Sequence, residues 1–322
     1  MSKPAFSVSL PAATALGKVE RLLGTWEGAL GQPVPTPLLR RENRVRTVLD
    51  TVAIEGNPLS LAQATAVLDG KRVRGERREI LEIQNANTAY ERVAQWNPLH
   101  QRSLLMAHRG LMDGLVPDAG RFRLTQVGVR QGDRVAHLAP PPHRVPDLVQ
   151  ALFRFLRAER TASLIVQAIV FHYELELIHP FSDGNGRIGR LWQHALLLRS
   201  SPAFAYVPTE SLIREHQADY YDALAASDRL GRCDPFLDFM LEILFLALQR
   251  GSAGFRAQPE TSKTRIAKAR AQLGHRWFSR KDYLALFPRL STASASRDLK
   301  SAITNSQLRS AGEHALTRYR FR

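Results

Sequence analysis

The most informative stretch of the chain is His179-Pro-Phe-Ser-Asp-Gly-Asn-Gly-Arg-Ile-Gly-Arg190, a run rich in polar groups between two apolar segments. Before it, residues 162–178 are mostly Leu, Ile, Val, Ala and Phe. This run ends at Pro180, which cannot donate the backbone hydrogen bond that a continuing helix requires. Helical character returns at about Arg187, and residues 191–198 are apolar enough to be buried. The pattern predicts two antiparallel core helices joined by a polar loop.

The loop carries the features of an anion site. Gly184, Asn185 and Gly186 stand directly before the second helix, where converging backbone N–H groups and the helix N-terminus attract negative charge. Arg187 and Arg190 lie three residues apart, so both side chains can project from one helix face toward the same ligand. Two guanidinium groups beside such a loop suit a ligand that carries several phosphates.

Two further side chains complete a reactive arrangement. Asp183 would be costly beside phosphates without a cation between them, and Mg²⁺ binds one or two carboxylates together with phosphate oxygens. His179, at the other end of the loop, can be neutral near pH 7 and accept a proton from an incoming hydroxyl. Phe181 is expected to point inward and fix the loop. The alternative, a helix terminator followed by surface arginines, explains fewer of these side chains.

The same residues also match the motif of a different class of nucleotide-binding site. Gly184-Asn-Gly-Arg-Ile-Gly189 satisfies G-x-G-x-x-G, and Glu210 follows at about the distance that a dinucleotide-binding fingerprint requires. That fingerprint also needs a preceding strand and alternating strands and helices, whereas both flanks here are helical. It leaves His179 and the arginines unexplained. The P-loop pattern G-x-x-x-x-G-K-[ST] does not occur in the sequence.

Composition places the chain among globular proteins. Its 322 residues are enough for two domains, and 44% hydrophobic residues fit a folded protein. The apolar runs are shorter than the roughly 18 residues that span a bilayer, and the first residues lack the apolar core of a signal peptide. A single cysteine, Cys233, excludes an intramolecular disulfide framework and fits a reducing compartment. We therefore expect a cytoplasmic protein without a membrane partner.

The net charge of +15 is unevenly distributed. Residues 255–322 contain 15 Lys/Arg and 4 Asp/Glu, whereas residues 1–254 contain 30 Lys/Arg and 26 Asp/Glu. The C-terminal part therefore resembles a separate basic module, which favours a polyanionic partner such as nucleic acid. The alternative is a solvated basic face without a ligand.

Helical periodicity dominates the rest of the chain. We expect helices at residues 12–30, 38–54, 61–68, 77–96, 98–115, 145–158, 210–227 and 235–250. The best strand candidate is residues 125–138, where Gln131-Gly-Asp133 separates two β-prone arms like a hairpin turn before Pro140-Pro-Pro142 ends them. The expected divisions are an N-terminal helical region (1–100), a helical core (101–250), a linker (251–262) that opens with Gly251-Ser-Ala-Gly254, and a C-terminal domain (263–322).

The C-terminal domain reads as three short helices and a hairpin. The helices are expected at residues 263–273, 280–287 and 292–303, with Ser279 and Ser291 as N-caps of the second and third. Residues 307–321 form two arms around Ala311-Gly-Glu313. This order is typical of a winged helix-turn-helix domain.

Residues His179–Arg190 resemble the signature of Fic-domain proteins, H-x-F-x-[DE]-G-N-G-R-x-x-R, at every specified position. His108-Arg-Gly-Leu-Met112, Gly120-Arg-Phe-Arg123 and the hairpin also follow the order usual in that family. The resemblance covers about residues 38–250, and a C-terminal winged helix is a familiar companion. It implies a mainly α fold, with a Fic-type helical core and a β-hairpin flap.

The resemblance implies transfer of AMP from ATP to a Ser, Thr or Tyr hydroxyl of a protein. His179 would take the proton of the acceptor, and Asp183 would hold Mg²⁺ or Mn²⁺ on the α- and β-phosphates. The glycine loop would bind phosphate oxygens, and Arg187 and Arg190 would bind the β- and γ-phosphates. Members of the family also transfer phosphocholine or phosphate, so the donor is an inference from the complete motif.

Two other regions match more weakly. The hairpin would align the acceptor segment of the target by strand pairing, through Val127, Gly128, Val129 and Arg130. The residues that match the border of the nucleotide site are Tyr220, Tyr221 and Asp228.

Thr51-Val-Ala-Ile-Glu-Gly-Asn57 resembles the inhibitory motif of the family, [ST]-x-x-x-E-[GN]. The resemblance implies that the helix at about 38–56 presents Glu55 to Arg190, occupying a guanidinium that would otherwise bind the γ-phosphate. In this family the same glutamate can position a water molecule that removes AMP. The alternative is an ordinary glutamate before a glycine C-cap.

In the C-terminal domain, the side chains available for phosphates or base edges are Ser294, Ser296, Arg297 and Lys300, with Arg309, Arg318, Arg320 and Arg322 on the wing. The alternative role is docking, either to the target protein or to a second copy in a homodimer. A further hypothesis is an ATP-responsive transcription regulator with vestigial catalysis, although a sensor would not need His179.

Overall fold

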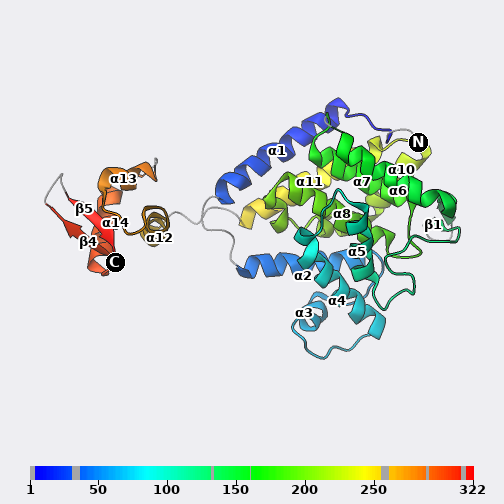
Figure 1. Cartoon of the computed structure of the whole chain (residues 1–322), viewed down its shortest axis with the longest axis horizontal. Helices are drawn as coiled ribbons and strands as arrows, with labels where there is room; N and C mark the ends of the chain where they lie inside the picture. The colour runs from blue at the N-terminus through cyan, green and yellow to red at the C-terminus, as the bar shows by residue number, and fades with distance from the viewer. Residues whose placement is uncertain are drawn as a thin grey trace. The chain divides into compact units, whose positions relative to one another are not determined.

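Helices dominate residues 1–255, as the sequence predicts (Figure 1). The computed structural model describes residues 4–30, 37–131, 134–159, 161–254, 261–287, 290–312 and 317–322. For residues 29–30, 37–40, 129–131, 134–138 and 252–254 it describes the backbone alone. The chain divides into two units, Met1–Phe255 and Arg256–Arg322. Residues 1–100 and 101–250 therefore share one unit.

The helices of the first unit are α1 (Leu10–Leu30), α2 (Pro37–Ala53), α3 (Leu61–Leu68), α4 (Arg77–Arg92), α5 (Gln101–Met112), α6 (Val145–Ala158), α7 (Leu164–Ile178), α8 (Asn185–Ser200), α9 (Thr209–Glu215), α10 (Gln217–Leu230) and α11 (Asp234–Gly254). Short 3₁₀ turns lie at Val93–Gln95, Pro142–Arg144 and Pro202–Tyr206. Among the described residues, no helix combines the length and apolar character that crossing a bilayer requires.

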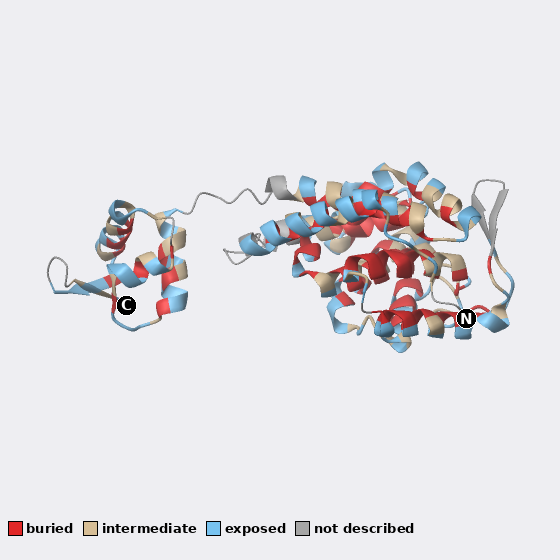
Figure 2. Cartoon of the chain, turned by 90° about the horizontal axis from the view of Figure 1, so that it is seen from above, coloured by how far each residue is buried: buried red, intermediate tan, exposed pale blue. Residues whose placement is uncertain are grey.

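The core of this unit is built around α7 and α8, which pack against each other. Figure 2 shows that the buried residues gather in the interior of this unit. Both helices are buried on most sides, which explains the nearly continuous apolar sequence of α7. The close approach depends on Gly189, because a Cβ there would lie 2.7 Å from Glu176 Oε1 and 2.9 Å from His172 Cδ2.

Two boundaries differ from the sequence prediction. The helix expected at 210–227 is two helices, α9 and α10, separated at His216, and the sequence has no glycine or proline there to indicate the break. The proposed start of the linker is wrong, because Gly251–Gly254 belongs to α11. Gly251 serves helix packing, since a Cβ there would lie 2.7 Å from the Trp26 ring of α1.

The predicted hairpin consists of β1 (Gly128–Gln131) and β2 (Arg134–Leu138), which pair antiparallel. The register shifts between Val129 and Arg130, so the pairing contains a bulge or irregularity. The tip of the expected turn, residues 132–133, lies outside the described residues.

The second unit contains α12 (Ser262–Leu273), α13 (Arg280–Ala285) and α14 (Thr292–Thr304), with β3 (Phe278–Ser279), β4 (Leu308–Ala311) and β5 (Arg318–Phe321). The strands form one antiparallel sheet in the order β3-β5-β4. The predicted caps are confirmed, because Ser279 accepts from Asp282 N and Ser291 from Ser294 N. The short strand β3 was not expected from the sequence.

Candidate active site

The loop between α7 and α8 begins with a backbone conformation that is uncommon outside glycine. His179 has φ 48° and ψ 61°, which ends α7 and turns the chain into the loop. The buried side chain of Arg123 holds this turn, because its Nε donates to the His179 carbonyl at 2.7 Å and its Nη2 to Pro140 O at 2.6 Å. Arg123 therefore ties the turn at His179 to the segment that follows the hairpin.

The imidazole of His179 is arranged to act as a base. Its Nδ1 lies 3.4 Å from the Glu176 carbonyl oxygen, which can only accept, so the proton belongs on Nδ1 and Nε2 keeps its lone pair. Burial lowers the pKa of His179 below its ordinary value, while the carboxylates of Glu176 and Glu55 act in the opposite direction. The ring is therefore neutral at pH 7.

A buried aromatic stack supports the middle of the loop. The rings of Phe181 and His108 lie 3.6 Å apart and nearly parallel, and His108 Nε2 lies 2.9 Å from Asp183 O. His108 Nδ1 accepts from Gly120 N, and burial lowers the pKa of this histidine to about 4, so it donates from Nε2 as a neutral ring. As expected, Phe181 points inward.

Asn185 holds the loop closed. Its Oδ1 accepts from Phe181 N and its Nδ2 donates to Phe181 O, both at 2.9 Å. The side chain is therefore used within the loop, and only the backbone of Asn185 remains to meet a phosphate. Gly184, before it, has φ 81°, and a Cβ there would lie 2.5 Å from Met112 Sδ.

The Glu55 carboxylate occupies the anion site that the sequence predicts at Gly184–Gly186. A Cβ added to Gly186 would collide with the carboxylate of Glu55, so that carboxylate lies against the first turn of α8. Arg190 Nη2 donates to Glu55 Oε1 at 2.7 Å, and its Nε and Nη2 also donate to Thr51 Oγ1 and O. Burial would lower the pKa of Arg190, but Glu55, Tyr220 and Glu176 together outweigh burial and raise it.

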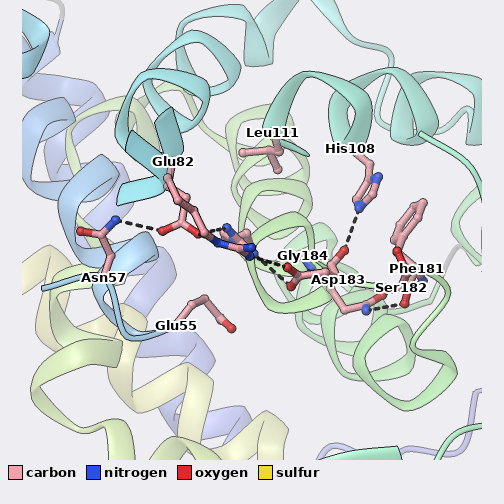
Figure 3. A network of polar contacts seen from close by, with 12 residues as sticks. Glu55, Asn57, Glu82, His108, Leu111, Phe181, Ser182, Asp183 and Gly184 are labelled. Atoms are coloured by element: carbon pink, nitrogen blue, oxygen red, sulfur yellow. Dashed lines mark hydrogen bonds and ion pairs between the residues drawn. The ribbon is translucent and has the colours of Figure 1, made fainter. Parts of the chain in front are cut away.

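Arg187 faces a different set of carboxylates. It is buried, and its Nη1 and Nη2 donate to Glu82 Oε1 and Asp183 Oδ1, each at 3.1 Å. The other oxygen of Asp183 accepts from Arg78 Nη2 at 3.1 Å (Figure 3). The two arginines of the motif thus contact separate carboxylates in this state, although the sequence suggested one shared ligand.

Asp183 can serve a divalent cation. Its side chain is 41% exposed, whereas Glu82 is only 12% exposed and is held by Arg187. In the part of the chain that the structure describes, no three His, Cys, Asp or Glu side chains gather into a metal site. One exposed carboxylate fits Mg²⁺, which completes its coordination with phosphate oxygens and water.

The residues expected to border a nucleotide are not equivalent. Tyr220 is 1% exposed and its hydroxyl meets His172 Nε2 at 3.2 Å, so it is a core residue. Tyr221 is half-buried, and its hydroxyl donates to Ile54 O at 3.5 Å, beside the end of α2. Asp228 lies about two helical turns further along α10, near Tyr173. Burial is the main cause of the raised pKa of Tyr173, and the Asp228 carboxylate adds a smaller effect.

The remaining predicted contacts are only partly described. Gly128 begins β1 and Val127 directly precedes it, whereas the side chains of Val129 and Arg130 are outside the described residues. On α14, Ser294 accepts from Arg297 Nη2 and Ser296 from Arg280 Nη1. The exposed basic side chains of this unit include Arg297, Lys300, Arg309, Arg318, Arg320 and Arg322.

Sequence reasoning missed four residues that shape the site: Arg78, Glu82, His108 and Arg123. Arg78 and Glu82 lie on a polar helix face with many other charges, and no spacing marks them as special. His108 and Arg123 stand in segments whose order resembles the family, which was the available signal.

A sequence model of the Fic/DOC family matches residues 98–197. Protein adenylyltransferase fic-1 of Caenorhabditis elegans is 32% identical over 225 residues, which are 66% of this chain and 42% of that protein. Protein adenylyltransferase Fic of Culex quinquefasciatus is 32% identical over 214 residues, 63% of this chain and 40% of that protein. The chain thus spans about two fifths of the length of these curated relatives.

Solved structures of Fic proteins match a larger share of this chain than the curated relatives do. Fic-1 from C. elegans has a TM-score of 0.64 and 28% identity, covering 76% of this chain and 73% of that chain. A Fic family protein from Desulfovibrio desulfuricans G20 has a TM-score of 0.74 and 35% identity, covering 100% of this chain and 98% of that chain. Because this relative agrees in sequence and fold along almost its entire length, the chain belongs to the Fic family.

Proposed function

We propose that this chain is a protein adenylyltransferase that Glu55 holds in an inhibited state. The observation that carries the proposal is the Glu55 carboxylate, which lies against Gly186 and pairs with Arg190 at 2.7 Å. An anion bound at a helix N-terminus beside a buried arginine marks the place where phosphate oxygens would bind. The names of the curated relatives, protein adenylyltransferases, supply the reaction.

In the proposed reaction, Nε2 of His179 takes the proton of a protein Ser, Thr or Tyr hydroxyl. The hydroxyl oxygen attacks the α-phosphorus of ATP, a new P–O bond forms, and the bond between the α-phosphorus and the bridging oxygen breaks. Pyrophosphate leaves and AMP stays on the protein. Mg²⁺ or Mn²⁺ held by Asp183 would neutralise charge on the phosphates.

Glu55 inhibits transfer because it occupies the arginine and the anion site that ATP needs. While Arg190 is bound to Glu55 and Thr51, its guanidinium is not available to a γ-phosphate, and the carboxylate repels phosphates from the anion site. The hairpin β1–β2 would serve as the flap that presents the acceptor segment. With Arg190 engaged, Glu55 could also position water for removal of AMP, so we include the reverse activity in the proposal.

The test uses purified Glu55→Gly protein with ATP and Mg²⁺ or Mn²⁺, read by mass spectrometry. We expect AMP on the protein itself or on a lysate protein, because the variant frees Arg190. Adding His179→Ala should reduce the rate by at least about 10²-fold, the usual contribution of a general base. The mass of the adduct separates AMP from phosphocholine and phosphate, and transfer of nothing by Glu55→Gly would refute the proposal.

We also propose that the second unit is a winged helix-turn-helix domain that binds DNA. Its support is the charge, 15 Lys/Arg against 4 Asp/Glu, with Arg297 and Lys300 exposed on α14. We expect binding to duplex DNA that weakens steeply between about 50 and 200 mM salt, measured by fluorescence anisotropy. Absence of binding at low salt would assign the domain to docking of the target or of a second copy. ATP-dependent DNA binding without AMP transfer would favour a transcription regulator.

A further inference from the structure

Glu82, in the middle of α4, forms hydrogen bonds with both Asn57 and Arg187. Its Oε1 accepts from Arg187 Nη1 at 3.1 Å, and its Oε2 accepts from Asn57 Nδ2 at 2.9 Å. Asn57 belongs to the turn that carries Glu55, and Figure 3 shows its side chain beside Glu82. Arg187 belongs to the first turn of α8, directly after the loop that contains Asp183. The Glu82 carboxylate, 12% exposed, therefore contacts the turn that carries Glu55 and the first turn of α8 at the same time.

Asn57 fixes the inhibitory turn to α4. It is 7% exposed, and besides its bond to Glu82 its Nδ2 donates to Glu79 O at 3.0 Å. Its Oδ1 accepts from Leu59 N at 3.1 Å. Both polar groups of the side chain are thus engaged, and the contacts hold the chain directly after Gly56, whose φ of 94° turns it away from α2.

Arg187 pairs with both Glu82 and Asp183 and so links α4 to the loop between α7 and α8. Its Nη2 donates to Asp183 Oδ1 at 3.1 Å; the Arg187 side chain is 5% exposed, whereas the Asp183 side chain at the rim is 41% exposed. Arg78 also contacts Glu82 and Asp183, but it is 56% exposed and its ion pairs are correspondingly weak. The continuous path runs from Asn57 through Glu82 and Arg187 to Asp183.

We propose that Glu82 is a positioning residue for inhibition. Its hydrogen bonds to Asn57 and Arg187 hold the turn that carries Glu55 next to the Arg187–Asp183 pair, and we call these contacts the Glu82 latch. This inference rests on the proposed function and adds to it a second anchor of the inhibitory segment, separate from the Glu55–Arg190 contact. A carboxylate is needed because both partners donate. A glutamine at this position has one acceptor oxygen, and its NH₂ group would face a donor.

The first measurement is hydrogen–deuterium exchange of residues 50–60, which does not depend on any activity. The backbone N–H groups of Ile54, Glu55, Gly56 and Asn57 all donate to carbonyls of α2, so their exchange reports opening of the turn. Losing a hydrogen bond to a charged acceptor should accelerate this exchange about tenfold in Glu82→Gln and Asn57→Ala. Gln84→Ala, an exposed position on the same helix, is the matched control and should leave it unchanged.

The second measurement is self-modification with ATP and Mg²⁺. With Glu55 present, Glu82→Gln and Asn57→Ala should each raise the rate about tenfold, and the double variant should gain no more than either one. In the Glu55→Gly background neither should raise it further, because the inhibitory carboxylate is already gone. A structural role alone would not produce this dependence on Glu55.

The outcomes separate the two proposals. Unchanged exchange in both variants, or an additive double variant, would overturn the latch. If Glu82→Gln lowers the thermal midpoint, Asn57→Ala tests the same latch with the Glu82–Arg187 contact intact. If Glu55→Gly transfers no AMP, the proposed function fails, and the exchange data still decide whether Glu82 holds the turn.

Discussion

At the scale of single residues, the site depends on side chains whose surroundings determine their chemistry. His179 owes its position to a left-handed backbone conformation, which the hydrogen bond from Arg123 Nε to the His179 carbonyl stabilises. Arg190 is buried and depends on Thr51 and Glu55 for its partners. Burial lowers the pKa of His179 below its ordinary value, whereas Glu55, Tyr220 and Glu176 together outweigh burial and raise the pKa of Arg190.

This difference predicts the pH dependence of transfer. A base must be neutral, and burial holds the pKa of His179 below its ordinary 6.5. Glu176, Arg123 and Glu55 are the charged groups around it, and the glycine of Glu55→Gly removes one carboxylate that raises the pKa. We expect kcat of Glu55→Gly to be flat near pH 7 and to fall only as the pH drops below 6.5. A decline that begins above pH 7 would contradict a desolvated base.

At the scale of elements, the close packing of α7 and α8 sets the geometry of the loop. Glycine is required twice for steric reasons, at Gly184 against Met112 and at Gly189 against Glu176 and His172. Gly184 also needs its φ of 81°, which L-residues adopt only with strain. These positions show that glycines of the motif have a steric role in the packing of the loop and of α8.

Gly189→Ala should therefore destabilise the first unit by about 1–3 kcal/mol, the usual range for overpacking a core. Gly184→Ala should do the same and also slow AMP transfer in the Glu55→Gly background, because it shifts Asp183. Gly24→Ala on α1 is the control, since a Cβ there meets nothing within 4 Å and alanine should stabilise the helix by about 0.5–1 kcal/mol. Thermal or urea unfolding measures all three; a neutral Gly189→Ala would show that α7 and α8 can move apart freely.

At the scale of the whole molecule, the two units have separate hydrophobic cores. The core of the second unit contains an ion pair, because Asp298, 3% exposed, accepts from Arg265 Nε and Nη2 and from Tyr283. This pair joins α12 to α14 and places a carboxylate inside an otherwise basic unit. Stability of this unit can therefore be changed without touching the loop between α7 and α8.

We expect Asp298→Ala to destabilise the second unit by about 3 kcal/mol, as breaking a buried ion pair does. In the Glu55→Gly background, self-transfer of AMP below the new melting temperature should stay within twofold of the parent. Lys300→Ala, exposed on the same helix, should change stability by less than about 0.5 kcal/mol. Circular dichroism melts and mass spectrometry provide the two readings, and loss of transfer in Asp298→Ala would show that the units depend on each other.

The sequence by itself determined which segments are helical, the polar loop between the two apolar helices and the caps of the second unit, because these features depend on local periodicity and hydrogen bonding. It also indicated the Glu55–Arg190 contact, although only through a resemblance. The tertiary structure decided that Tyr220 is core, that Gly251–Gly254 is helix and that Glu82 joins Asn57 to Arg187. Those facts depend on contacts between residues far apart in the chain, and no local pattern encodes which charged residue of an amphipathic helix meets a distant loop.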